Sequence, residues 1–296
     1  SAVEQVIIEY SRSPDLVAHL RRRFPGLPVH VRAVNAEALQ HLHRTAWTDW
    51  RPALSPIRAI YRIVRLLRDD VRCRRLSSGV LSISAWDSRH YWARLPGRAP
   101  VYDVPYVCPW PGLRPRSRPQ PWTERRDAMI CLAAARDSIG AGCVRGFCSL
   151  AVRLAAAEVL PHWRFQVSAG TYSRSQPDRL PEGVEPLSGL REPWDLLCGT
   201  RAAAVLTPLG YGAKTTVFDA LAARCHVLVH PRLARRLPPE VRACCVEVDP
   251  QRPPDLPSLA AILHSEPRPN AVNESLRRMA LANLQAALGR EKTPGR

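Results

Sequence analysis

Residues 205–230 constrain the fold most strongly, because an apolar run, a glycine turn, a helix and a second apolar run follow one another there. The first apolar run ends at Pro208, and Gly210 and Gly212 permit a tight turn before the helix. Strand, turn, helix and strand in this order form the repeating unit of a parallel sheet with crossover helices. We therefore expect an α/β protein.

The same alternation runs along the rest of the chain. Strands are expected at 6–9, 29–33, 79–84, 101–104, 128–134, 164–169, 183–187, 202–207, 226–230 and 244–248. Helices are expected at 13–24, 35–44, 56–69, 87–94, 147–157, 194–198, 215–223, 256–265 and 273–288. A turn containing Gly140 and Gly142 is expected to precede the helix at 147–157.

Five prolines lie within residues 109–121, and such a segment is expected to be extended, stiff and unable to join a helix or a central strand. We place the domain boundary there. The predicted parts are an incomplete Rossmann-like domain, a Pro/Arg-rich linker, a complete doubly wound parallel sheet and a C-terminal helix. They span residues 1–108, 109–126, 127–268 and 269–296, respectively.

The chain is strongly basic, with 43 Lys and Arg against 26 Asp and Glu and a net charge of +17. A surplus of this size favours polyanionic partners, whether nucleic acid, phosphorylated sugars or an anionic membrane surface. The alternative is a compositional one. Arg far outnumbers Lys, and Ala and Pro are abundant, as expected of a GC-rich coding sequence.

Nine cysteines are scattered through apolar stretches without a CxxC pair, which favours reduced, buried thiols in a cytosolic protein. Neither their spacing nor that of the histidines suits a metal site, so no metal or cofactor is predicted. We find no run of eighteen apolar residues and no secretion signal, and we expect a cytoplasmic protein that spans no membrane.

The turn after residue 208 suits a phosphate-bearing ligand. Ligands of open α/β sheets bind outside the carboxyl ends of strands, and the free amides where a helix begins, at Thr215 or Thr216, favour phosphate oxygens. Asp219 lies one turn into this helix, where a carboxylate can accept hydrogen bonds from the paired hydroxyls of a ribose. The GxGxK pattern alone is weak, and the spacing of a P-loop is absent.

The whole run from residue 205 to 223 resembles the donor-site segment of GT-B glycosyltransferases of the family 4, or group 1, type. The resemblance implies a GT-B-like fold and assigns Asp219 to the nucleotide ribose. It also assigns two cations, Arg136 and Arg145, to the donor diphosphate, unless these are two of many surface arginines. Most members carry a second Glu eight residues before the helix acid, where this chain has Tyr211. The implied donor-binding residues are Arg136, Arg145, Gly210, Tyr211, Gly212, Lys214, Thr215, Thr216 and Asp219.

The resemblance extends to the first part of the chain, but it begins partway through the acceptor domain. Residues 31–37 and 81–87 match acceptor-domain strands, with Val34 where the family often has His. A first strand with an unpaired edge is an aggregation hazard. A partner chain, an upstream coding segment or a reduced fold would each resolve this.

Two further groups in the first part have alternative interpretations. The aromatic and histidine side chains are either core residues or an acceptor-binding surface: His41, His43, Trp47, Trp50 and Trp86. The arginines are either solvated helix faces or a patch for an acceptor or for membrane phosphates, peripheral at the inner membrane face: Arg21, Arg22, Arg23, Arg62, Arg65 and Arg68.

Three functions remain open from the sequence. The first is transfer of a sugar from a nucleotide-diphosphate donor to a hydroxyl of a glycan, a lipid-linked molecule or a small molecule. By resemblance this would retain the anomeric configuration and need no metal. The second is a catalytically impaired nucleotide-sugar-binding remnant or partner subunit. The third is a nucleic-acid-binding protein, for which no recognisable motif exists.

Overall fold

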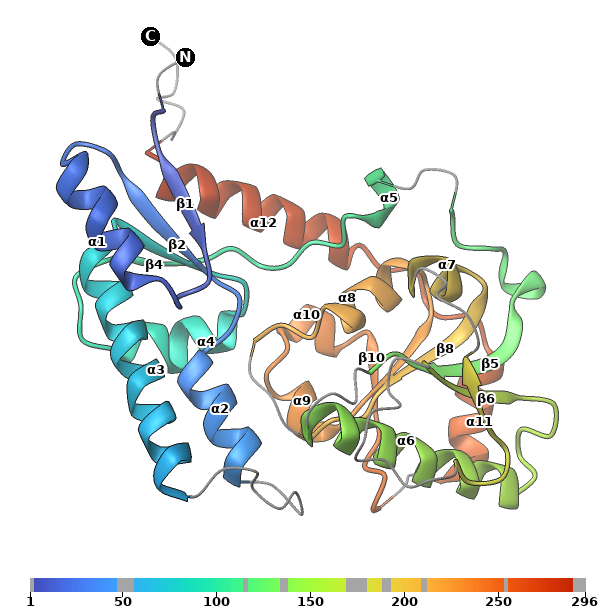
Figure 1. The fold of residues 1–296 in the computed structure, drawn as a ribbon. Helices are drawn as coiled ribbons and strands as arrows, with labels where there is room; N and C mark the ends of the chain where they lie inside the picture. The colour runs from blue at the N-terminus through green and yellow to red at the C-terminus, as the bar shows by residue number, and fades with distance from the viewer. Residues whose placement is uncertain are drawn as a thin grey trace, which may run out of the picture. The chain divides into compact units, whose positions relative to one another are not determined.

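The structure is a computed structural model that describes residues 3–46, 56–113, 117–133, 138–168, 180–187, 193–208, 212–252 and 255–289 (Figure 1). Its contacts divide the chain into two compact units. The first unit comprises Ser1–Val107, Tyr211–Ala213 and Glu274–Arg296. The second unit comprises Cys108–Gly210 and Lys214–Asn273.

The first unit is built on a parallel sheet of four strands in the order β1-β2-β3-β4. The strands are β1 (Val6–Glu9), β2 (Val29–Ala33), β3 (Gly79–Ser82) and β4 (Val101–Asp103). The helices are α1 (Pro14–Arg23), α2 (Glu37–Ala46), α3 (Pro56–Leu76), α4 (Ala85–His90), the 3₁₀ turn η1 (Trp92–Arg94) and α12 (Val272–Ala287).

Each strand of this sheet lies beside the next strand in the chain, so right-handed crossovers place the connecting helices on one face. Two apolar clusters fill the space beneath them. One joins Val17 of α1 and Cys73 of α3 to Val29 and Val31 of β2. The other surrounds Trp92, which is fully buried.

The C-terminal helix α12 belongs to the first unit, although it follows the second in sequence. The Asn283 amide donates a hydrogen bond of 2.5 Å to the carbonyl of Asp103, at the end of β4. The Gln5 amide donates one of 2.8 Å to the carbonyl of Leu288, directly after α12. In sequence, the second unit therefore lies between two parts of the first.

The second unit is built on a parallel sheet of six strands in the order β10-β9-β8-β5-β6-β7. The strands are β5 (Arg126–Cys131), β6 (Arg164–Ser168), β7 (Val184–Leu187), β8 (Thr200–Val205), β9 (His226–Val229) and β10 (Cys245–Glu247). The helices are α5 (Trp110–Leu113), the 3₁₀ turn η2 (Trp122–Glu124), α6 (Ser138–Ala156), α7 (Pro193–Cys198), α8 (Thr215–Ala222), α9 (Pro231–Ala234), α10 (Pro239–Arg242) and α11 (Leu256–His264). Two parallel α/β sheets are thus present, as predicted.

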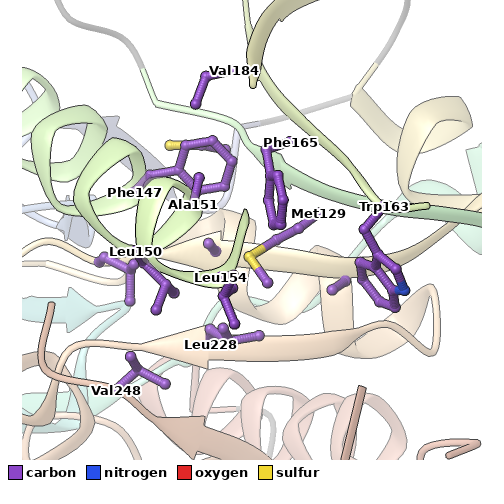
Figure 2. Close-up of a cluster of buried hydrophobic side chains, with 14 of the residues drawn as sticks. Met129, Phe147, Leu150, Ala151, Leu154, Trp163, Phe165, Val184, Leu228 and Val248 are labelled. Carbon is purple, nitrogen blue, oxygen red and sulfur yellow. The ribbon is translucent and has the colours of Figure 1, made fainter. Parts of the chain in front are cut away.

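The core of the second unit is a large apolar cluster, shown in Figure 2. Side chains of α6 and α11 cover one face of the sheet there, and the strands contribute the opposing residues. Helix α8 contacts β8 and β9 and buries Val217, Phe218 and Leu221. The cluster includes Met129, Phe147, Leu150, Leu154, Trp163, Phe165, Leu228, Val248, Leu259 and Leu263.

Helix α6 begins nine residues earlier than the sequence predicts, so the expectation of a turn at Gly140 and Gly142 is wrong. Both glycines lie inside the helix, because packing of its apolar face outweighs their low helix propensity. Gly146 has a packing reason as well. A Cβ added there would lie 3.1 Å from the carbonyl oxygen of Leu206, so glycine lets the helix approach the end of β8.

Two other expectations need correction. The proline-rich segment contains one helical turn, α5, whose Pro111 lies in the first turn, where a missing N–H breaks no helical bond. Among the described residues, one stretch, Ile139–Ala156 of α6, is also long and apolar enough to cross a membrane by length and composition. Since its side chains fill the core of the second unit, core packing accounts for this composition.

Candidate functional site

The strand order of the second sheet reverses between β5 and β8. From β5 the chain moves outward through β6 and β7, and then returns to the other side of β5 as β8, β9 and β10. The strands that follow β5 and β8 in the chain therefore lie on opposite sides of this pair, which makes β5 and β8 the switch point of the sheet. In doubly wound sheets this switch point is where ligands bind.

From β8, one of the two switch-point strands, the chain continues to α8. Gly212 has a φ of 80°, a conformation in which a side chain is strained, so a glycine is needed here. Lys214 precedes the helix, which begins at Thr215, and its carbonyl accepts a hydrogen bond of 2.9 Å from the amide of Val217. The amino end of α8, with the positive end of its dipole, thus lies after the switch-point strand.

Asp219 is half-buried in α8 and interacts with Cys108, the first residue of the second unit. The thiol donates a hydrogen bond to the carboxylate. Burial raises the pKa of Cys108 to about 12, and the charge of Asp219 adds to this shift. The Asn273 side chain holds Cys108 by accepting from its amide at 2.8 Å and donating to its carbonyl at 3.4 Å. The carboxylate is therefore held by a fixed backbone segment.

Two cations come to the same end of the sheet. The close contact of Gly146 with Leu206 places the neighbouring Arg145, an exposed residue of α6, near the end of β8. The Lys214 ammonium lies close enough to the buried Cys143 thiol of α6 for its charge to favour a lower pKa of that thiol. Two cations on this side of the sheet would favour an anionic ligand.

The structure describes six of the predicted site residues, and all six lie on α6 or on the segment from the end of β8 into α8: Arg145, Gly212, Lys214, Thr215, Thr216 and Asp219. Arg136, Gly210 and Tyr211 lie outside the described residues. Three residues beside the predicted ones were not expected from the sequence: Gly146, Cys108 and Asn273. A glycine beside a site arginine was a usable signal for the first. No local pattern could connect residues 108 and 273, which are 165 positions apart.

In the first unit, the described members of the predicted acceptor-binding surface, His41, His43 and Trp86, lie on two different helices. Trp86 packs against His90 of its own helix, with ring centroids 4.9 Å apart. His41 and His43 lie on α2, and Trp47 and Trp50 lie outside the described residues. Glu37, also on α2, forms an ion pair of 2.5 Å with Arg12.

All nine cysteines are free thiols, and six of them are buried. The sulfur atoms of Cys131 and Cys143 lie 3.9 Å apart, and this contact together with burial raises the pKa of Cys131 well above its ordinary value. Within the described ranges, no three His, Cys, Asp or Glu side chains are grouped so that they could hold a metal ion.

No protein-family model matches the chain. No curated protein matches it either. Several solved structures do resemble it, and three of them are representative.

Sucrose-phosphate synthase from Thermosynechococcus elongatus has a TM-score of 0.53 and 13% identity, with 97% of this chain and 71% of that chain covered. A UDP-forming alpha,alpha-trehalose-phosphate synthase from Burkholderia xenovorans, in complex with glucose-6-phosphate, has a TM-score of 0.53 and 12% identity, with 96% and 70% covered. Anabaena Alr3699/HepE in complex with UDP-glucose has a TM-score of 0.52 and 12% identity, with 97% and 74% covered.

These similarities extend over almost the whole chain, so they concern both sheets together. At such low identity they show the fold alone. The chain is an α/β protein with two parallel sheets and a GT-B-like fold.

Proposed function

We propose that the second unit binds a nucleotide-diphosphate sugar and that the chain transfers the sugar to a hydroxyl acceptor. The observation that carries this proposal is the location of the predicted donor segment. The loop from β8 into α8 starts at the switch point of a doubly wound sheet, with Asp219 one turn into the helix. The neighbouring structure of Alr3699/HepE contains UDP-glucose, which supports a donor of this class.

Each residue has a distinct proposed role. Asp219 accepts hydrogen bonds from the ribose hydroxyls, since a carboxylate can accept these in addition to the bond from the Cys108 thiol. Arg136 and Arg145 neutralise the diphosphate, which gathers negative charge as the glycosidic bond breaks. Lys214 and the loop 210–216 lie beside the phosphates or the sugar. We propose that the reaction retains the anomeric configuration and needs no metal.

A second candidate is nucleotide-sugar binding without transfer. Tyr211 replaces the acidic residue that contacts the donor sugar in most glycosyltransferases of the family 4 type. In this case the chain would act as a partner subunit. A free edge on β1, which pairs only with β2 among the described strands, is where a second chain could add a strand.

The test is a panel of UDP-, GDP- and ADP-sugars, with donor binding followed by thermal shift and donor cleavage followed by release of the nucleotide diphosphate. We expect one nucleotide class to stabilise the protein. Asp219→Asn should weaken binding of that donor by roughly ten- to a hundred-fold, since a charge-assisted bond to the ribose is lost. Glu182→Gln, which changes an exposed carboxylate of the same unit, should leave binding unchanged.

A second variant pair tests the role of the cation on α6. Arg145→Met should lower the rate of donor cleavage on the order of a hundred-fold. Arg153→Met, which removes an exposed arginine two turns further along the same helix, should not. If no nucleotide sugar stabilises the folded protein, both candidate functions are wrong. If the protein binds a nucleotide sugar but neither cleaves it nor transfers the sugar to any acceptor tried, the second candidate function is favoured.

A further inference from the structure

Helix α3 of the first unit exposes an unusual set of large apolar side chains. Four of them lie within eight residues and are more than half exposed: Ile57 (79%), Ile60 (62%), Tyr61 (69%) and Val64 (58%). Leu67 continues the series at 39%. The spacing of three and four residues places all five on one side of a helix. They form a continuous apolar stripe, named here the α3 stripe.

The α3 stripe lies away from the core. Helix α3 packs against α1 and α2, and its own residues Ala59, Asp70 and Cys73 are buried. At 100° per residue, the α3 stripe is centred roughly 140° from this buried face. The rest of the exposed side carries Arg58, Arg62, Arg65 and Arg68, all exposed. The solvent-facing half of α3 is therefore itself amphipathic, with an apolar arc beside a cationic arc.

The cationic arc continues into a cavity between α2 and α3, with a volume of about 510 Å³. Arginines 12, 58, 62 and 65 line it together with His41, against two carboxylates, Glu37 and Asp69. Glu37 already pairs with Arg12. Arg62 and Arg65 form no ion pair with any residue that the structure describes. The cavity thus carries surplus positive charge that is available to an anion.

A surface that combines these two features matches one kind of partner best. Nucleic acid would use the arginines but would gain little from aliphatic side chains. A protein partner could bury the apolar stripe, but burying four adjoining arginines would also require a matching set of acidic groups on that partner. An anionic bilayer satisfies both arcs, because the aliphatic residues enter the boundary of the acyl chains while arginines contact lipid phosphates.

We propose that the exposed side of α3 docks the first unit on an anionic lipid bilayer. The α3 stripe inserts at the interface, and Arg62, Arg65 and Arg68 contact lipid phosphates, with the cavity between α2 and α3 accepting a headgroup phosphate. This inference does not depend on the proposed donor site, because none of the proposed donor residues lies on α2 or α3. It is tested without any nucleotide sugar.

The experiment is co-sedimentation of the full chain with vesicles of phosphatidylcholine, with or without about one-third phosphatidylglycerol. We expect binding to the anionic vesicles only, and weaker binding at high salt because the charges are screened. Binding that is equal on neutral vesicles, or absent from both, would overturn the proposal.

Two matched pairs of variants locate the surface. Replacing Arg62, Arg65 and Arg68 by Ser should weaken anionic-vesicle binding on the order of a hundred-fold, from the usual contribution of a juxtamembrane arginine. Replacing Arg21, Arg22 and Arg23 of α1 by Ser removes the same charge from a helix with a different exposed face, and should cost only a few-fold, roughly, through the weaker overall field. Equal losses would show nonspecific attraction and overturn the assignment to α3.

The second pair tests insertion. Ile60→Ser with Val64→Ser should weaken binding on the order of tenfold or more, whereas Met279→Ser with Leu281→Ser, two exposed apolar residues of α12, should not. Thermal melts confirm that each variant is folded. If the variant of the α3 stripe instead converts a dimer to a monomer in sedimentation velocity, the stripe covers a second copy of the chain and the membrane proposal is wrong.

Discussion

In the first unit the strands lie in chain order, β1-β2-β3-β4, whereas in the second the order is β7-β6-β5-β8-β9-β10. The first arrangement sends every crossover in the same direction. The second reverses direction after β7 and creates a switch point between β5 and β8. The candidate ligand site therefore follows from strand order, because adjacent loops separate only where the direction of winding reverses.

The two units also differ in what they bury. The second unit has one large apolar cluster, to which α6 and α11 contribute from the same side. The first has two smaller clusters and also polar groups that are almost fully buried, among them Asp70 and His30. We therefore expect the stability of the first unit to depend on pH, and that of the second to depend mainly on close packing.

The largest effect is expected at Asp70. Its carboxylate accepts hydrogen bonds from the Ser11 hydroxyl and, at 2.5 Å, from the Tyr91 hydroxyl, while burial raises its pKa to about 7. The folded state therefore holds a proton that the unfolded state releases above pH 4. The stabilisation is complete below that pH and is lost as pH rises through 7, by on the order of 3 kcal/mol.

Asp70→Asn keeps a neutral polar group in this position and should remove that loss. Urea unfolding followed between pH 4 and 8 measures the change. Asp69→Asn, at the neighbouring and more exposed carboxylate, is the control and should leave the slope with pH intact. A wild-type profile that is flat between pH 4 and 8 would contradict the assignment of a buried, proton-binding Asp70.

The next effect concerns packing in the second unit and compares two glycines of one helix. Gly146→Ala places a methyl group 3.1 Å from the Leu206 carbonyl oxygen and should destabilise the protein by about 1–3 kcal/mol. Gly142→Ala meets nothing within 4 Å and should stabilise α6 by about 0.5–1 kcal/mol. Chemical denaturation at a single pH measures both. Shifts of the same sign would mean that α6 does not press against the end of β8.

The smallest effect is expected at His30, whose ring nitrogens have no hydrogen-bond partner among the described residues. Burial lowers its pKa below 6.5, so the folded state holds the neutral ring. The stability that this contributes is present above pH 6.5 and is lost as pH falls, because the unfolded state then takes up a proton. His30→Gln should reduce this acid-side loss, because it removes the group that takes up the proton.

His226→Gln is the matched change in the second unit. Burial lowers the pKa of His226, the contact of its ring with the carbonyl oxygen of Ser265 at 2.7 Å opposes this shift, and the charge of Arg125 adds to it. Denaturation at pH 5 and pH 7 should therefore show a reduced acid-side loss for His226→Gln as well. An acid-side loss that neither substitution reduces would contradict the assignment of buried, neutral rings at both positions.

Much of the architecture follows from local sequence. The strands and their order of appearance were predictable, since apolar runs bounded by Gly, Pro and polar residues specify buried strands without tertiary information. The errors occurred where packing overrides local preference. The start of α6 is one case, because its glycines predict a turn, yet the apolar cluster of the second unit keeps them helical.

The sequence by itself determined the α/β class, the glycine turn before α8 and the identity of the candidate site residues, because these depend on residue type and short-range spacing. Only the tertiary structure showed that Cys108 contacts Asp219 and is held by Asn273, that Gly146 lies close to the end of β8, and that the α3 stripe faces solvent. These facts depend on contacts between distant residues. An amphipathic period reports that a helix has two faces, but the packing of its neighbours decides which face is buried.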